Sequence, residues 1–293
     1  MVGAPASSSI ASQVRVLFHP GCIDMDSLVR ISSYQAITQL VSVLPFIHQT
    51  RTRSRRTHDE LDIEFLGNTK GEPWRIQTNL YGNGSTGHGR EERYRLWFDP
   101  SKEFHRYSIL WTAKNIIFYI DDVPIREVIR NEEMGSEYPS KPMSLYATIW
   151  DASSWATSGG KYKVNYKFAP FVSEFKDFVL EGCSSDPIEE FPSFDCYETD
   201  ARLENADYAT ITPRQRSAMR RFRQRYMYYS YCYDALRYPV PLPECVMIPS
   251  EKERFRDTGR LKFGGSHQGG RRRSRRRGRG RVQASTSEYD PDM

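Results

Sequence analysis

Residues 58–67 read HDELDIEFLG, a run in which acidic and large apolar residues alternate. Successive side chains of a β-strand point to opposite faces, so the run predicts a strand with one acidic and one apolar face. Glu60, Asp62 and Glu64 would project together with His58, while the residues between them enter a hydrophobic core. A solvated acidic face is the ordinary explanation, but strict alternation in a chain with 13% aromatic residues favours a catalytic site.

Short strands separated by Gly, Pro, Asn and Asp are expected to continue on the C-terminal side of this run. With the first strand included, they cover residues 58–65, 75–81, 93–98, 105–111, 116–120, 123–130, 143–149, 161–168 and 172–180. Short strands with almost no helical periodicity predict an all-β fold, an antiparallel β-sandwich or jelly roll.

One helix is expected after the strands, at about residues 213–228. Thr212 and Gln215 have the spacing of a capping box with Pro213 at the first helical position, and apolar residues then recur at helical spacing. The helix also carries six arginines: Arg214, Arg216, Arg220, Arg221, Arg223 and Arg225. RNA binding is one interpretation of them, but a solvated face on a helix docked through its aromatic stripe is favoured.

The formal net charge of the 293-residue chain is +5, and it comes entirely from the C-terminal tail. Residues 271–281 read RRRSRRRGRGR and only three acids follow them, so residues 1–270 hold 34 basic and 34 acidic side chains. A nucleic-acid-binding domain carries its basic residues on a folded face, so this class is disfavoured. No apolar run reaches the length of a membrane span.

The cysteines indicate an oxidising compartment. Cys183 and Cys196, and likewise Cys232 and Cys245, lie 13 residues apart, which suggests two local disulfides, although five reduced thiols including Cys22 remain the alternative. The tripeptide Asn83-Gly84-Ser85 is an N-glycosylation acceptor. The N-terminus, MVGAPASSSIASQVRVLF, does not read as a signal peptide. The cysteines and the glycosylation tripeptide indicate secretion, whereas the N-terminal sequence does not.

Three carboxylates on one strand face repel one another, and this raises the affinity of at least one of them for a proton. One ionised and one protonated carboxylate are the equipment of a glycoside hydrolase, in which one acts as nucleophile and the other as acid and then base. Glu60 and Glu64 have Cα atoms about 13 Å apart in a regular strand, so their side chains must lean inward for a retaining reaction. Asp62 lies between them and can hydrogen-bond the nucleophile.

HDELDIEFLG resembles the active-site signature of the plant xyloglucan endotransglucosylase/hydrolases of glycoside hydrolase family 16. Further matching segments follow in family order: QTNLY at 77–81, GRE at 89–91, LWFDP at 96–100, IDDVPIR at 120–126, ASSWAT at 152–157, and the stretch from 231 to 245. The resemblance covers residues 58 to about 265. It implies a concanavalin-like jelly roll with a short C-terminal helical extension, and chemistry that uses no metal or cofactor.

Carried over residue by residue, the resemblance makes Glu60 the nucleophile, Glu64 the acid/base and Asp62 the assisting carboxylate of a retaining double displacement. Gln77, Thr78 and Asn79 would hydrogen-bond the glucan near the cleavage point. The other implied substrate contacts are Gly89, Arg90, Glu91, Ser154, Trp155, Gly159 and Arg237. Ser154 stands where most relatives have an acid, and Asn83 is the candidate glycosylation site because the usual one after the signature is absent.

Residues 1–57 do not resemble the family, and its N-terminal strands are expected to be missing or garbled. A shifted reading frame over 34–49 permits PSDYTAGVGVAFYTS, which resembles the family's usual text there, so we hypothesise that this segment is a frame-shifted reading of an ordinary family gene. The nucleotide sequence upstream of His58 tests this. As written, the chain would leave sheet edges unpaired, so we expect it to fold poorly and to be nearly inactive, unlike a frame-corrected chain.

The predicted organisation has four parts: residues 1–57, a catalytic jelly roll at 58–182, a C-terminal extension with two disulfides at 183–265, and a disordered tail at 266–293. The predicted enzyme is secreted to the cell wall and apoplast and binds xyloglucan donor and acceptor chains. Arg271 to Arg281 would contact an acidic wall polysaccharide such as pectin. The alternatives are a non-catalytic glucan-binding wall protein and a protein whose tail captures nucleic acid.

Overall fold

The computed structural model describes the chain in parts. They are residues 23–30, 41–49, 59–67, 72–141, 143–151, 162–168, 171, 173–181 and 210–262. For the strands at 23–30, 41–49, 144–150 and 174–181 only the backbone is described. Within these parts no helix has the length and apolar character needed to cross a bilayer.

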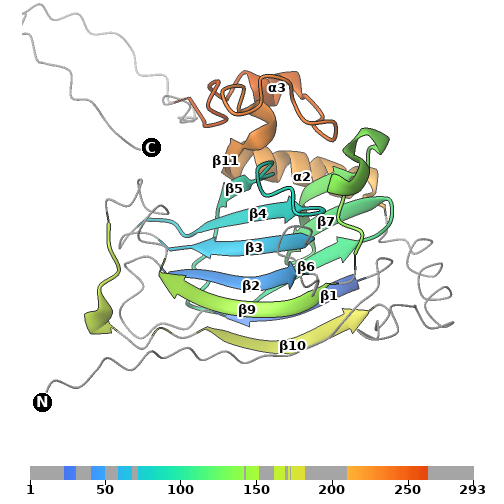
Figure 1. The fold of residues 1–293 in the computed structure, drawn as a ribbon. Coiled ribbons are helices and arrows are strands. Elements are labelled where there is room, and N and C mark those ends of the chain that lie inside the picture. The colour runs from blue at the N-terminus through green and yellow to red at the C-terminus, as the bar shows by residue number, and fades with distance from the viewer. Residues whose placement is uncertain are drawn as a thin grey trace, which may run out of the picture.

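Two antiparallel sheets form the body of the molecule (Figure 1). The six-stranded sheet has the order β11 (Met227–Ser230), β5 (Glu92–Arg95), β4 (Arg75–Tyr81), β3 (Glu60–Leu66), β2 (Val41–Gln49) and β9 (Ser144–Asp151). The five-stranded sheet has the order β10 (Glu174–Glu181), β1 (Ile23–Arg30), β6 (His105–Trp111), β7 (Asn115–Ile120) and β8 (Val123–Ile129). The predicted all-β antiparallel sandwich is confirmed.

The hydrophobic core lies between the sheets because the strands alternate as the sequence predicts. Leu61, Ile63 and Phe65 of β3 belong to one buried cluster with residues of β6, β7 and β8. The rings of Phe65 and Tyr107 meet edge to face with their centroids 4.9 Å apart, an arrangement that aromatic pairs prefer. The acidic side chains of β3 therefore belong to the opposite face of the six-stranded sheet.

The predicted strands are found within a few residues of their expected bounds, with one exception. The expected strand at 161–168 is wrong: its described part ends in a 3₁₀ turn, Tyr166–Phe168. Asn165 begins this turn, because its side-chain oxygen accepts from Lys167 N at 3.1 Å and its carbonyl from Phe168 N at 3.1 Å. A local side chain thus offers the backbone an alternative to a strand ladder.

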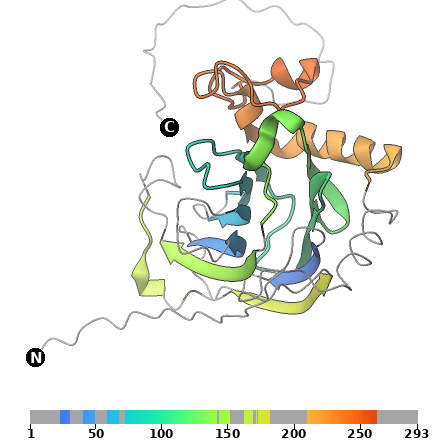
Figure 2. The ribbon, with the colours of Figure 1, turned by 45° about the vertical axis from the view of Figure 1, so that its right-hand side comes forward.

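Helix α2 (Pro213–Tyr226) has the predicted capping box, in which Thr212 accepts from Gln215 N and the Gln215 side chain accepts from Thr212 N. Met219 and Phe222 are buried, so the docked apolar face is confirmed. Figure 2 shows α2 beside the five-stranded sheet. The helix ends at Tyr226 rather than 228, because the next residues form β11, which pairs with β5. Besides α2 and the turn at Tyr166–Phe168, the described residues form three further helical elements: η1 (Glu132–Glu137), η4 (Tyr231–Tyr233) and α3 (Pro249–Lys252).

The expectation that the N-terminal strands are missing needs correction. β1 lies between β10 and β6, and β2 lies between β3 and β9, all with antiparallel pairing. Pro45 of β2 falls where the register shifts against both neighbours, a position in which the lack of an N–H is tolerated. The edge beside β3 is therefore occupied, and the unpaired edges predicted there do not arise.

Candidate active site

The register of three neighbouring strands builds the site. Glu60, Asp62 and Glu64 of β3 pair with Tyr81, Asn79 and Gln77 of β4, and Gln77 pairs in turn with Arg93 of β5. Paired residues of adjacent strands point to the same face. This face therefore carries the three carboxylates, two amides and a guanidinium, on the side of the sheet away from the core.

Glu64 is the best-defined carboxylate of the site. Its side chain is buried, and Gln77 Nε2 donates to Glu64 Oε2 at 3.0 Å. Burial raises the pKa of Glu64, the hydrogen bond from Gln77 and the charge of Arg93 lower it, and Glu60 raises it further, for a result of about 7. Glu64 is thus half protonated near neutral pH, which suits a group that must give and take a proton.

Asp62 is buried between the two glutamates. Burial raises its pKa well above the ordinary value, and the charges of Glu60 and Glu64 add to this effect. A hydrogen bond joins the Asp62 and Glu60 side chains and favours the protonated form of Asp62. In its protonated form Asp62 can donate this hydrogen bond to the Glu60 carboxylate, and its assisting role stays a prediction.

The proton affinity of Glu64 predicts a pH-dependent stability. Because its folded pKa of about 7 lies above the ordinary value of 4.5, its contribution is fully present below pH 4.5 and is lost as the pH rises through 7. Between these values the free energy of unfolding of the wild type should fall by about 3 kcal/mol relative to Glu64→Gln. Urea denaturation of both proteins across this range measures the difference, and parallel profiles would contradict the assignment.

Of the three residues predicted to bind glucan on β4, Gln77 and Asn79 lie on the site face, but Thr78 does not. Its side chain is buried toward the core, where Arg126 Nη1 donates to Thr78 Oγ1 at 2.9 Å and to its carbonyl at 3.0 Å. Three consecutive strand residues cannot share one face, because side chains alternate. The predicted role of Thr78 as a sugar contact is therefore corrected to an anchor for β4.

Gly89, Glu91 and Arg237 come together beside the carboxylates. Arg237 Nη1 and Glu91 Oε2 form an ion pair at 2.6 Å, and Tyr238 OH donates to Gly89 O at 2.8 Å. A Cβ on Gly89 would lie 2.6 Å from both Arg237 Nη2 and Glu91 Oε1, so the absence of a side chain lets this pair close over the loop. The structure thus places the C-terminal extension against the site.

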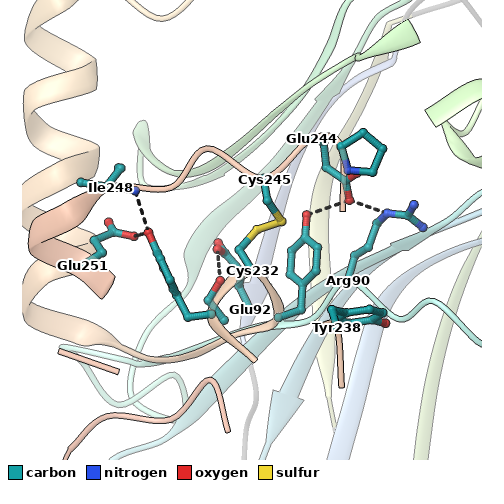
Figure 3. The surroundings of a disulfide bond; sticks show 12 residues. Arg90, Glu92, Cys232, Tyr238, Glu244, Cys245, Ile248 and Glu251 are labelled. Atoms are coloured by element: carbon teal, nitrogen blue, oxygen red, sulfur yellow. Dashed lines mark hydrogen bonds and ion pairs between the residues drawn. A yellow bond between two sulfur atoms is a disulfide. The ribbon is translucent and has the colours of Figure 1, made fainter. Parts of the chain in front are cut away.

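Arg90 has a different place from the one expected. Its side chain is fully buried and pairs with Glu244 at 2.6 Å and with Glu137 at 2.5 Å. Figure 3 shows it directed at Glu244, beside the disulfide. Its backbone N–H donates to Asn79 Oδ1 at 2.8 Å. The guanidinium is therefore occupied inside the protein, and it is the backbone N–H of Arg90 that contacts the site, at Asn79.

The predicted Cys232–Cys245 disulfide is confirmed, with Cα atoms 5.5 Å apart. Asn83 lies in an exposed turn with a φ of 51°, where its Oδ1 accepts from Lys141 Nζ at 2.6 Å, and its glycosylation stays a prediction. The remaining predicted features fall outside the described residues: His58, Ser154, Trp155, Gly159, the pair Cys183 and Cys196, and the tail. In the described ranges no group of three or more His, Cys, Asp or Glu is arranged to hold a metal ion.

Sequence reasoning missed two arginines near the site. Arg93 Nε donates to Gln77 Oε1 at 2.6 Å, and the signal for it was its place two residues after Glu91, on the same strand face. Arg223 was assigned to a solvated helix face, but its guanidinium contacts the buried Glu92. Arg223 lies four residues after the buried Met219, so helical spacing could have placed it on the docked side.

The sequence was compared with known families and proteins. Residues 42–168 match the family described as "Glycosyl hydrolases family 16". Residues 199–245 match the family described as "Xyloglucan endo-transglycosylase (XET) C-terminus". Among solved structures, apo Crh5 transglycosylase is similar with a TM-score of 0.44 at 24% identity, over 60% of this chain and 68% of that chain.

Three relatives from Arabidopsis thaliana are named probable xyloglucan endotransglucosylase/hydrolase proteins 30, 29 and 27. Protein 30 is 72% identical over 81% of this chain and 68% of its own length. Protein 29 is 67% identical over 72% of this chain and 62% of its own length. Protein 27 is 56% identical over 80% of this chain and 70% of its own length. The chain thus spans about two thirds of their length. It belongs to the xyloglucan endotransglucosylase/hydrolase family, within glycosyl hydrolase family 16.

Proposed function

We propose that this chain cleaves the β-1,4-glucan backbone of xyloglucan with retention and transfers the new end to another xyloglucan chain or to water. The observation that carries the proposal is the file of Glu60, Asp62 and Glu64 on one strand face, in which burial brings the pKa of Glu64 to about 7. The relatives' names supply the substrate. A retaining enzyme needs a nucleophile and a separate acid/base, and the two glutamates fit these roles.

In the first half-reaction the Glu60 carboxylate attacks the anomeric carbon from the α face. The bond from that carbon to the bridging oxygen breaks, and Glu64 gives its proton to the departing 4-oxygen. The products are a free chain end and an α-linked glycosyl ester of Glu60. The hydrogen bond from protonated Asp62 to the Glu60 carboxylate holds the nucleophile in place.

The second half-reaction reverses these roles. Glu64, now ionised, takes a proton from the 4-hydroxyl of an acceptor chain or from water, and the oxygen attacks the anomeric carbon from the β face. The ester bond to Glu60 breaks, and Glu60 returns as a carboxylate. The β configuration is restored, and Glu64 carries the proton needed for the next cycle.

Other parts of the proposal follow from the residues of the site. Gln77, Asn79 and the Glu91–Arg237 pair lie where they can hydrogen-bond sugar hydroxyls near the cleavage point. The proposed place of action is the cell wall, reached by secretion to the apoplast. Neither the described residues nor the relatives support an acidic wall polysaccharide as partner of Arg271–Arg281, so it forms no part of this proposal.

The test is the transfer of a xyloglucan chain to a fluorescent xyloglucan oligosaccharide, followed by size-exclusion chromatography. The chain as written, a frame-corrected chain and a Glu60→Gln control are expressed in parallel. Because β1 and β2 are paired within the two sheets, the near-inactivity expected from unpaired edges no longer follows, and we expect label in long chains for the first two and none for the control. Activity of the frame-corrected chain alone would contradict the proposal for this polypeptide and would restore the non-catalytic alternative.

A further inference from the structure

An ordered row of side chains connects the C-terminal extension to the carboxylate that moves the proton. Tyr229 of β11 and Arg93 of β5 are paired in register, and the Arg93 guanidinium lies 4.9 Å from the centroid of the Tyr229 ring. Arg93 Nε donates to Gln77 Oε1 at 2.6 Å, and Gln77 Nε2 donates to Glu64 Oε2 at 3.0 Å. Each contact joins two neighbouring strands, so the row runs from β11 through β5 and β4 to β3.

The chemistry of Arg93 decides which way the Gln77 amide points. A glutamine amide presents an acceptor at one end and a donor at the other, and the two ends have nearly the same shape. A guanidinium can only donate, so the end of Gln77 that meets Arg93 must be its oxygen. The NH₂ group is then the end that faces Glu64, and it stabilises an ionised carboxylate there.

Tyr229 supplies the support that keeps Arg93 in this place. Its ring is buried, and its hydroxyl donates to Asp234 Oδ2 at 3.1 Å, so the ring itself is anchored. A cation over the face of an aromatic ring is attracted by the ring's quadrupole. The extension therefore fixes Arg93 without occupying the donor that Gln77 needs.

Among the described residues, Glu60 of the same strand and Glu91, one residue before β5, oppose the ionisation of Glu64, and Arg93 is the cation that favours it. Asp62 lies on the same strand face and also interacts electrostatically with Glu64. On β2 the residues opposite Glu64 lie between Val43 and Phe46 and are Leu44 and Pro45, which do not titrate. Loss of Arg93 would therefore leave Glu64 among like charges, beside an amide that is free to turn.

We propose that Arg93 is a positioning residue, held by Tyr229, that fixes the Gln77 amide with its NH₂ toward Glu64 and so keeps Glu64 able to ionise for the second half-reaction. The proposal rests on the proposed function, because it assigns Glu64 the acid/base role. Glycosylation of Glu60 needs protonated Glu64, whereas its release needs ionised Glu64. The upper pH limit of the first half-reaction and the lower pH limit of the second therefore both depend on this row of contacts.

The first experiment compares pH profiles of kcat/KM for the donor and for the acceptor. In Arg93→Met the alkaline limb for the donor and the acid limb for the acceptor should both move to higher pH, by about one pH unit or more. Arg93→Lys keeps a cation that can only donate and should restore most of the profile. Arg75→Met is the matched control, since Arg75 of β4 lies 5.4 Å from the centroid of the Tyr228 ring and has no hydrogen bond to Gln77 among those described; its limbs should stay in place.

The double variant separates positioning from simple charge. In a Gln77→Leu background, Arg93→Met should move the limbs less than it does in the wild type, because the amide is gone. An equal shift in both backgrounds would overturn the proposal, since Arg93 would then act on Glu64 as a charge alone. Unmoved limbs in Arg93→Met would also overturn it. Tyr229→Leu, which leaves β5 untouched, should shift the limbs in the same direction by a smaller amount.

A measurement without substrate keeps the inference separate from the proposed function. The carboxyl ¹³C signal of Glu64, identified by its loss in Glu64→Gln, is titrated in the wild type and in Arg93→Met or Arg93→Lys. The Met variant should titrate at higher pH than the wild type, and the Lys variant close to it. Identical titrations in the wild type and the Met variant would refute the positioning role, whereas an inactive wild type with shifted titrations would refute only the proposed reaction.

Discussion

Glu60→Ala should lower the transfer rate by at least about 10⁴-fold, the order of loss expected when the nucleophile of a covalent mechanism is removed. The reason is that no ester can form once the attacking carboxylate is gone, although Glu64 is still present to give a proton. Glu60 is only half-buried at the start of β3, so truncation to alanine opens no cavity in the core. Transfer assays at saturating donor and acceptor measure the loss, and thermal unfolding checks that the fold is intact.

Sodium azide distinguishes the nucleophile from the acid/base through the configuration of its product. With an activated aryl β-glycoside as donor, azide can enter the space left by Glu60 and attack from the α face, which gives an α-glycosyl azide. In Glu64→Ala the glycosyl ester still forms, and azide then attacks it from the opposite face and gives the β-glycosyl azide. Anomeric coupling constants in the proton NMR spectrum identify each product.

Three results would contradict these assignments. One is a β-azide from Glu60→Ala, which would exchange the roles of the two glutamates. Another is a Glu60→Ala variant that keeps more than about 1% of the wild-type rate, which a missing nucleophile does not allow. The third is an equal loss in Glu103→Ala, since Glu103 is largely exposed and lies outside the site face.

The parts of the fold that the sequence predicted are those determined by neighbours along the chain. Alternation over residues 58–67 was enough to separate the site face of β3 from its core face. The capping box placed the start of α2 because Thr212, Pro213 and Gln215 are close in sequence. The Cys232–Cys245 bridge closes a short local loop and was predicted for the same reason.

The parts that the sequence did not predict depend on segments that meet only in the folded protein. Arg223 pairs with Glu92 of β5, which lies 131 positions away in the sequence. The sequence near α2 therefore did not indicate that this arginine has an acidic partner inside the protein. Arg90 pairs with Glu244 across 154 positions. Thr78 was misplaced for another reason: the family resemblance assigned one role to three consecutive residues, and alternation along β4 gives the middle one to the core.

Glu92→Gln is expected to cost about 3–5 kcal/mol of unfolding free energy, the range for a buried ion pair that loses one partner. Glu92 of β5 is buried, and it accepts from Arg223 Nη2 at 2.9 Å, from Ser230 Oγ at 2.9 Å and from the Tyr94 hydroxyl. Arg126 Nε lies 3.7 Å from it. The variant would remove the carboxylate beside the buried Arg126 and would leave Arg223 with Glu251 as its remaining acidic partner among the described residues. Urea denaturation at pH 7 measures the cost.

The matched control is Glu127→Gln. Glu127 of β8 also pairs with an arginine of α2, at 2.6 Å, but that partner, Arg216, is 39% exposed. Water can solvate Arg216 when the pair is lost, so the expected cost is no more than about 1 kcal/mol. A similar loss of unfolding free energy in both variants would mean that burial does not determine how much the Glu92 contacts stabilise the fold.

Acid provides the decisive test, because Glu92 and Glu64 are shifted in opposite directions. Burial by itself would raise the pKa of Glu92, but the charges of Arg223 and Arg126 outweigh it and lower the pKa to about 2. Glu92 therefore stabilises the fold fully above its ordinary pKa of 4.5, and this contribution disappears as the pH falls from 4.5 toward 2. The stability difference between the wild type and Glu92→Gln should shrink over that range, while the difference between the wild type and Glu64→Gln changes between pH 4.5 and 7. A Glu92→Gln difference that stays constant down to pH 2 would show that the carboxylate charge does not hold the C-terminal extension to the catalytic sheet.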